Sequence, residues 1–142
     1  SSQPADMSGS IDYKTVTSRL NSQALSVSIF VSPQSDAIKS VARAGAQGVV
    51  IDTQPYCAAR TLAEAQTELD RLDNISQQAR KLGLAVSVMR GLSAKNIPPV
   101  AELGTIEDFV VGHSLISRAS LVGLDTAIRD LLPIVRVEPP RK

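Results

Sequence analysis

Short apolar runs alternate with helical patterns along most of this 142-residue chain. A continuous apolar run of four to eight residues is typical of a strand that is covered on both faces, as in a parallel sheet. Gly48–Asp52 is such a run, and Phe109–Val111 is a shorter one. Strands that alternate with helices indicate βαβ units, whose helices cover a parallel sheet. The sequence therefore predicts an α/β protein.

Four βα units can be traced in order. The predicted strands are 25–31, 48–52, 84–88 and 109–111, and the predicted helices are 13–20, 33–44, 61–82, 98–103 and 123–132. Ser32 is expected to cap the second helix, with Pro33 at its first position, and Gly45 to end it. Thr61 and Glu64 are spaced as a capping box for the long third helix. Pro133 is expected to end regular structure.

Helical periodicity predicts which side chains face the core. In the long helix the apolar stripe runs from Leu62 to Leu82 and comprises Leu62, Ala65, Leu69, Leu72, Ile75, Ala79 and Leu82. In the last helix the inward positions are Leu124, Ile128, Leu131 and Leu132. A hydrophobic content of 43% is enough for one core, so one domain is expected. A closed (β/α)8 barrel typically needs about 250 residues, which this chain does not provide.

Composition excludes several classes of function. A formal net charge of +1 gives no basis for a nucleic-acid partner. The single cysteine, Cys57, rules out an internal disulfide and fits the cytoplasm or another reducing compartment. Apolar runs stay well below the roughly 18 residues of a membrane span, so none is predicted. Because the chain begins with Ser, we expect it to have been processed, trimmed or cut from something longer.

The ends of the predicted strands carry the candidate chemistry, because ligands of parallel α/β proteins gather at the C-terminal ends of the strands. These ends contribute Ser32, Asp52–Thr53, Arg90–Gly91 and Gly112–His113. Gly112 lies between a predicted strand and a helical pattern, an arrangement that can direct backbone N–H groups and the helix dipole at an anion. His113 would lie at the mouth of that site, unless it is a structural side chain.

Asp52 and Cys57 each have a plainer interpretation. Asp52 could be a substitute catalytic acid or a metal ligand, but it has no second ligand nearby in sequence, so a solvated or Arg-paired carboxylate is the alternative and no metal site is predicted. Cys57 has no nearby His, and we interpret it as a small packing residue rather than a nucleophile.

Several short segments occur in an order and spacing known from one enzyme family. They are Val27–Phe30, Ala44–Ala46, Thr61–Gln66, Leu82–Leu84, Gly91–Ser93 with Asn96, and Val111–Ile116 with Arg118–Ala119. Over residues 24–137 the chain thereby resembles the C-terminal half of the pyridoxine 5′-phosphate synthase family. The resemblance implies half of a TIM (β/α)8 barrel, and it implies that the Gly91 and Gly112 loops, with His113, hold a substrate phosphate. Arg90 could add charge-assisted hydrogen bonds to that phosphate.

The chain departs from the family at the proton-transfer positions. The family has a catalytic Glu where this chain has Val50, a His where it has Asp52, and a catalytic His where it has Arg90. The family's Thr-Glu-Gly segment is replaced by Ser8–Ser10, and the first three strands, with their catalytic residues, have no counterpart. Valine carries no proton, and arginine stays protonated at any working pH, so neither can act as a general acid or base.

Three functional hypotheses follow. The first is a degenerate, non-catalytic subunit that keeps a phosphate-binding rim for a phosphate-bearing small molecule. The second is part of an active synthase that condenses 1-deoxyxylulose 5-phosphate with 3-amino-2-oxopropyl phosphate, without metal or cofactor. The third is an assembly module without a ligand. A half-barrel leaves two sheet edges and one face open, so a homo-oligomer or a second protein chain is expected, with a fragment as the other possibility.

The predicted organisation has three parts. Residues 1–23 form a loop and short helix, residues 24–137 the half-barrel, and residues 138–142 a charged tail. If the resemblance misleads, the fold alternative is a four-stranded flavodoxin-like sheet.

Overall fold

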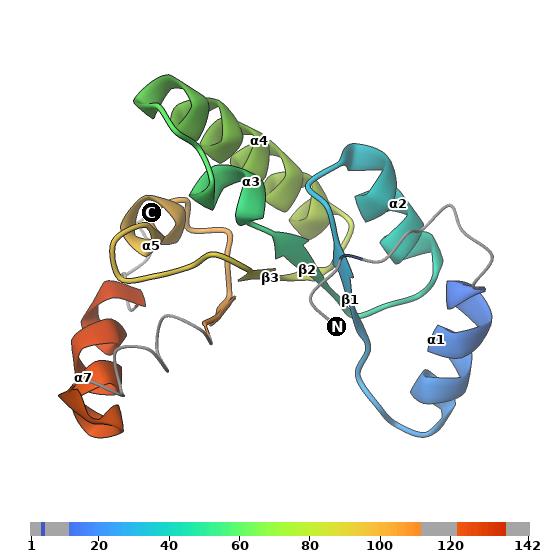
Figure 1. Cartoon of the computed structure of the whole chain (residues 1–142). Helices are drawn as coiled ribbons and strands as arrows, with labels where there is room; N and C mark the ends of the chain where they lie inside the picture. Colours follow the sequence, from blue (N-terminus) through green and yellow to red (C-terminus); the bar gives the residue numbers. More distant parts are fainter. Residues whose placement is uncertain (1–3, 5–11, 112–121, 136–142) are drawn as a thin grey trace.

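The computed structural model of the chain describes residue 4 and the ranges 12–111 and 122–135. Its centre is a four-stranded sheet made of β1 (Ser28–Val31), β2 (Gly48–Asp52), β3 (Ala85–Met89) and β4 (Asp108–Val110). The strands lie in the order β1-β2-β3-β4, and every neighbouring pair is parallel (Figure 1). This sequential order is that of successive βα units in a barrel. A flavodoxin-like sheet reverses its strand order at a switch point, so that alternative is wrong.

Helices connect the strands as the sequence predicts. They are α1 (Tyr13–Ser22), α2 (Ser35–Arg43), α3 (Gln54–Cys57), α4 (Leu62–Lys81), α5 (Ile97–Ala101) and α7 (Leu124–Val135). The short helix α3 lies in the segment predicted as a loop between β2 and α4. Within the described residues, no helix combines the length and apolarity that crossing a membrane requires.

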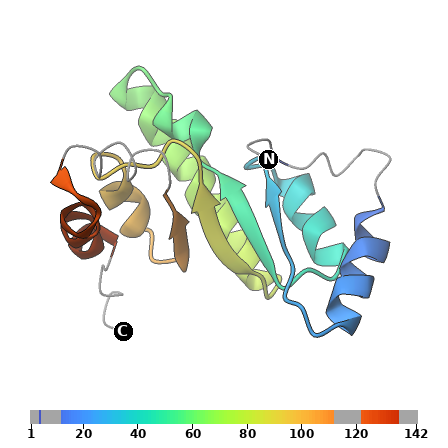
Figure 2. The ribbon, with the colours of Figure 1, turned by 60° about the horizontal axis from the view of Figure 1, so that its bottom comes forward.

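The two faces of the sheet differ. Alternation along the strands directs one set of side chains towards the helices, and these form the buried core with residues of α2 and α4. The strand members of this set are Ile29, Val31, Val49, Ile51, Val86 and Val88. Figure 2 shows α4 running behind β2 and β3, on the side that these residues face. The other face carries Phe30, Val50, Ser87 and Met89, which are only partly buried.

The start of α4 confirms the predicted cap but changes its partner. The Thr61 hydroxyl accepts a hydrogen bond from the Glu64 N–H at 3.1 Å. The Glu64 carboxylate accepts from the N–H of Arg60 at 2.8 Å. In a capping box it would bind the N–H of the cap residue, Thr61, which is the next residue along the chain. The predicted apolar stripe is too long at both ends, because Leu62 is 91% exposed and Leu82 is exposed as well. Leu72, Ile75 and Ala79 form its buried part.

Two predicted helix boundaries are wrong. Gln34 is extended, so α2 begins at Ser35, and Ser32 and Pro33 lie in the preceding loop instead of capping the helix. Pro133 does not end α7, which continues to Val135. A helix can keep an interior proline at the cost of one backbone hydrogen bond. Ile128 and Leu132 were predicted to face inward, yet they are 36% and 38% exposed. Helix α7 contacts α5.

Candidate functional site

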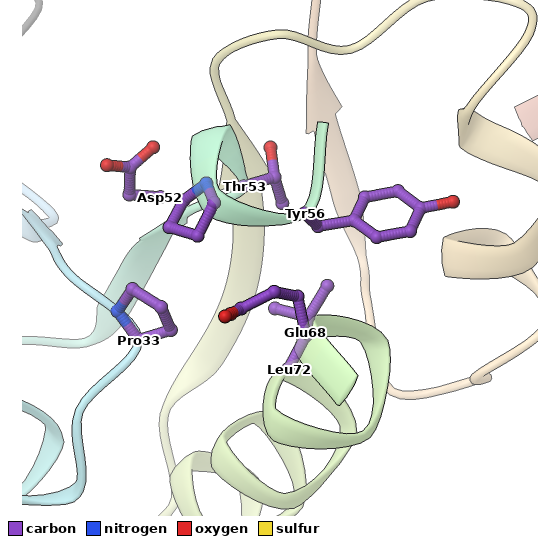
Figure 3. Close-up of a pocket in the computed structure, with 7 residues that line it drawn as sticks. Pro33, Asp52, Thr53, Tyr56, Glu68 and Leu72 are labelled. Carbon is purple, nitrogen blue, oxygen red and sulfur yellow. The ribbon is translucent and has the colours of Figure 1, made fainter. Parts of the chain in front are cut away.

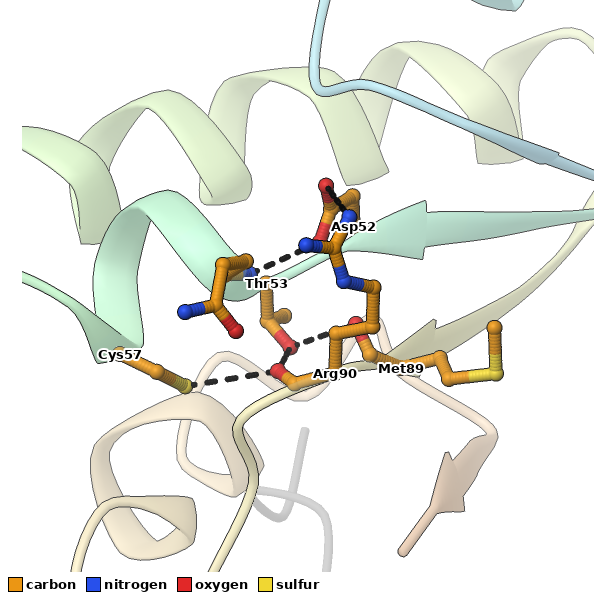
Figure 4. Close-up of polar contacts among 6 residues, drawn as sticks. Asp52, Thr53, Cys57, Met89 and Arg90 are labelled. Atoms are coloured by element: carbon orange, nitrogen blue, oxygen red, sulfur yellow. Dashed lines mark hydrogen bonds and ion pairs between the residues drawn. The ribbon is translucent and has the colours of Figure 1, made fainter. Parts of the chain in front are cut away.

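The residues that follow β2 and β3 meet at one end of the sheet. Asp52, the last residue of β2, pairs in register with Met89 at the end of β3. Thr53 and Arg90 come next in the two strands, and Figure 4 shows them side by side. The strand ends predicted to carry the chemistry are therefore brought together for Asp52, Thr53, Arg90 and Gly91.

An ion pair joins the two strand ends. The Arg90 guanidinium donates to the Asp52 carboxylate, with 3.0 Å between Nη1 and Oδ2 (Figure 4). The second carboxylate oxygen accepts from the backbone N–H of Gln54 at 2.9 Å. The Asp52 side chain is 8% exposed and that of Arg90 27%. Of the interpretations open for Asp52, the Arg-paired carboxylate is the one observed. Both of its oxygens are engaged, so proton transfer would require giving up a charge-assisted hydrogen bond.

Thr53 fixes the start of the loop after β3. Its N–H donates to the Met89 carbonyl at 2.9 Å. Its hydroxyl lies 2.9 Å from the carbonyl oxygen of Met89 and 2.6 Å from that of Arg90. A hydroxyl has one proton to donate, so the two carbonyls share it. Arg90 itself has a φ of 85°, a left-handed conformation that a residue with a side chain seldom adopts. Contacts to the carbonyl and guanidinium of Arg90 hold it there.

Gly91 is required by packing as well as by any ligand. Its φ is +74°, and a Cβ placed on it would lie 2.6 Å from Cys57 Cβ and 3.0 Å from Gln54 Oε1. Its carbonyl accepts a hydrogen bond from Asn96 Nδ2 at 2.8 Å. The contribution of Gly91 to an anion site would therefore be its backbone N–H.

Asn96 closes the loop that begins at Gly91. Besides its bond to Gly91, its Oδ1 accepts from the Ser93 N–H at 2.8 Å. Its carbonyl accepts from the Tyr56 hydroxyl of α3 at 3.0 Å. This loop is thereby tied to the turn after β2. Spacing alone gave no role to Gln54 or Tyr56, because their contacts depend on how α3 folds; Asn96 entered only as part of the family resemblance.

Cys57 is a packing residue, in agreement with its predicted role. The thiol faces the Arg90 carbonyl, with 3.6 Å from Sγ to the oxygen. Burial raises the pKa of Cys57 to about 11, with the negative charge of Asp52 adding to the rise and a hydrogen bond with Thr53 opposing it. The reactive form of cysteine is the thiolate, so a raised pKa keeps this residue unreactive at neutral pH. Burial also raises the pKa of Tyr56.

A small pocket lies beside the ion pair, between α3, α4 and the loop after β1 (Figure 3). It is lined by Pro33, Asp52, Thr53, Pro55, Tyr56, Glu68 and Leu72. The Glu68 side chain extends from α4 along this space in Figure 3. Asp52 and Glu68 are two carboxylates, and within the described ranges no group of three or more His, Cys, Asp or Glu residues is placed to hold a metal ion.

The predicted phosphate site comprises four residues on two loops, and the structure describes the loop that follows β3. Gly112 and His113 lie outside the described residues, as do Ser8–Ser10 and Arg118–Ala119. Of the predicted phosphate ligands, Arg90 and Gly91 are described. They lie next to each other after β3, and the Arg90 guanidinium is bound to Asp52.

The fold and the polar residues after β2 and β3 define a class of protein. Its members have parallel βα units in sequential order and polar side chains at the C-terminal ends of the strands. Within this class, the model of one family matches residues 6–137, the Pyridoxal phosphate biosynthesis protein PdxJ. Relatives named pyridoxine 5′-phosphate synthase are 40% identical over 118 residues in Geobacter sulfurreducens, 43% over 116 in Syntrophotalea carbinolica and 41% over 123 in Geotalea uraniireducens. These matches cover 83%, 82% and 87% of this chain and 49%, 48% and 52% of the relatives.

The chain belongs to the PdxJ family. It spans about half the length of the curated relatives it matches. Its four parallel strands and their helices form half of a TIM barrel. The resemblance that the sequence motifs indicated is thereby confirmed.

Proposed function

We propose that this chain is a non-catalytic PdxJ-family subunit that keeps a phosphate-binding rim and acts as a structural part of an assembly. The observation that carries the proposal is the Asp52–Arg90 ion pair. By resemblance, these two positions hold histidines in the family. Here they hold a carboxylate and a guanidinium that neutralise each other.

The position of Val50 supports the loss of proton transfer. Val50 lies on the partly buried face of the sheet, by alternation on the same face as Asp52. The family's catalytic Glu is replaced there by a side chain that cannot ionise. A general acid or base contributes about 10²–10⁴ to a rate, so losing two such groups leaves little activity.

The same rim remains suited to an anion. Arg90 is partly exposed, and its guanidinium has five N–H donors. The ion pair with Asp52 uses a donor on Nη1, so donors that point in other directions could bind an anion. Gly91 is the next residue in the chain, and its backbone N–H could be a further donor to the anion. An oxyanion with two or more oxygens matches a guanidinium well. Asp52 competes for the same cation, so we expect modest affinity.

A second candidate is an active synthase, favoured by the names of the relatives. In that case Asp52 would serve as the substitute base in condensing 1-deoxyxylulose 5-phosphate with 3-amino-2-oxopropyl phosphate. Arg90 and the backbone N–H of Gln54 already occupy the two carboxylate oxygens of Asp52, which argues against a free base at this position. The third candidate is an assembly module without a ligand.

Calorimetric titration with inorganic phosphate and pyridoxine 5′-phosphate tests the proposed rim. We expect saturable binding that Arg90→Ala weakens about tenfold or more, since one charge-assisted bond contributes about 1.5–3 kcal/mol. Asp52→Asn should strengthen binding, because it removes the competing carboxylate. Arg80→Ala is the matched control: Arg80, on α4, is paired with Glu107 and carries the same charge, and its loss should leave binding unchanged.

Circular dichroism of each variant confirms that it folds. If Asp52→Asn abolishes phosphate binding, the proposed competition between Asp52 and phosphate for Arg90 is wrong. A wild-type chain that shows no saturable binding would refute the phosphate site and favour the ligand-free assembly module.

A further inference from the structure

We infer that the helix-free face of the sheet and the outer edges of β1 and β4 form a docking surface for a complementary half-barrel. This partner would be a polypeptide of parallel βα units equivalent to the part of the relatives that lies outside the match. The inference rests on the sheet and on family membership and does not depend on phosphate binding.

The open face is built as the inside of a barrel. Phe30, Val50, Ser87 and Asp108 are in register across all four strands, and Asp52, Met89 and Val110 form the next row. Figure 2 shows this face turned away from α4. Val110 is exposed, although it is a large apolar side chain. The interior of a (β/α)8 barrel is filled by layers of side chains from strands all around it, and four strands supply only half of each layer.

The edges of the sheet are open as well. In the described part of the chain, β1 pairs with β2 alone and β4 with β3 alone. An unpaired strand edge exposes a row of N–H and C=O groups that another strand can bind. All four strands point the same way, so four further strands in the same direction would close an eight-stranded barrel.

The relatives favour a complementary half over a second copy. The 118 matched residues are 49% of the Geobacter sulfurreducens relative, so a similar length lies outside the match. A (β/α)8 barrel of that family pairs the matched half with the unmatched half. This chain is 40–43% identical to the matched half alone, so its inner face and edges are derived from a surface that fits the other half.

Mixing the 142-residue chain with the unmatched portion of the Geobacter sulfurreducens relative tests the inference. We expect native mass spectrometry to show a 1:1 complex. Hydrogen exchange should slow at the amides of β1 and β4 when the portion is added, while the amides of α2, on the outer side of the sheet, should not change. The exchange result needs no variant.

Paired variants then locate the interface. Phe30→Glu places a charge in the barrel interior and should weaken the complex about tenfold or more. Leu62→Glu makes the same kind of change at the 91% exposed start of α4 and should leave the affinity within about twofold. A chain that forms a stable homodimer with its own β1 and β4 protected would overturn the inference in favour of a second copy. A chain that stays monomeric and ignores the added portion would overturn it altogether.

Discussion

Arg90 has a left-handed backbone conformation, and its guanidinium is bound by the buried carboxylate of Asp52. The left-handed conformation costs a residue with a Cβ about 1–2 kcal/mol. Bonds from Thr53 and Cys57 to the Arg90 carbonyl, and the ion pair with Asp52, offset that cost. A side chain held in this way is a fixed positive charge, whereas a histidine at the same place could exchange protons near neutral pH. Under the proposed function, the change at position 90 replaces proton transfer by anion binding.

Gly91 allows a test of how tightly α3 is packed against this loop. Gly91→Ala should destabilise the fold by about 2–4 kcal/mol, since it combines a left-handed φ with a Cβ overlapping Cys57. Gly83→Ala is the matched control: Gly83 has a φ of +81°, a methyl group added to it would meet nothing within 4 Å, and the substitution should cost only about 1–2 kcal/mol, which is the cost of the left-handed conformation. Urea unfolding measures both. Equal losses would show that α3 does not press on Gly91.

Cys57 predicts a pH dependence. Because burial raises the pKa of its thiol to about 11, the thiolate should be scarce at about pH 8, and alkylation by iodoacetamide should speed up roughly tenfold per pH unit until about pH 11. The neutral thiol is the form favoured by folding, so its contribution to stability is present below about pH 9 and is lost as the pH rises towards about 11. Rapid alkylation of the folded chain at neutral pH would instead indicate an activated cysteine.

The bounds of helices and strands were predicted correctly where the determining residues lie within the element or at its cap. The bounds of β2 match their prediction because a buried strand needs only a continuous apolar run. The start of α4 matches because Thr61 caps it with its own side chain. The prediction for Leu62 failed because periodicity shows which side chains share a face but not where the neighbouring layer ends. Figure 1 shows the first turns of α4 extending beyond the sheet.

The candidate site was predictable in part. Parallel topology alone brings the residues after neighbouring strands together, so Asp52 and Arg90 could be named from sequence, with Arg pairing as one option for Asp52. The hydrogen bonds of Gln54 and Asn96 depend on the loop conformations after β2 and β3, which no periodic pattern encodes. The packing requirement at Gly91 was missed for the same reason, because it arises from contact with α3.

As a whole, the molecule belongs to the PdxJ family and spans about half the length of the relatives it matches. Half of a barrel has a complete outer layer, since its helices cover one face of the sheet, but an incomplete inner layer. Completing a barrel requires this architecture and does not require proton transfer. The proposed non-catalytic role and the proposed docking surface are therefore compatible, and each can be tested without the other.

The activity of a chimera tests whether this chain has lost proton transfer. In the full-length Geobacter sulfurreducens relative, the 118 matched residues are replaced by those of this chain, and formation of pyridoxine 5′-phosphate from the two phosphate substrates is measured. We expect no product above background from this chimera, and product at least about 10²-fold above background once Val50→Glu, Asp52→His and Arg90→His are introduced. Turnover by the unaltered chimera that disappears with Asp52→Asn would contradict the non-catalytic role and identify Asp52 as a working base.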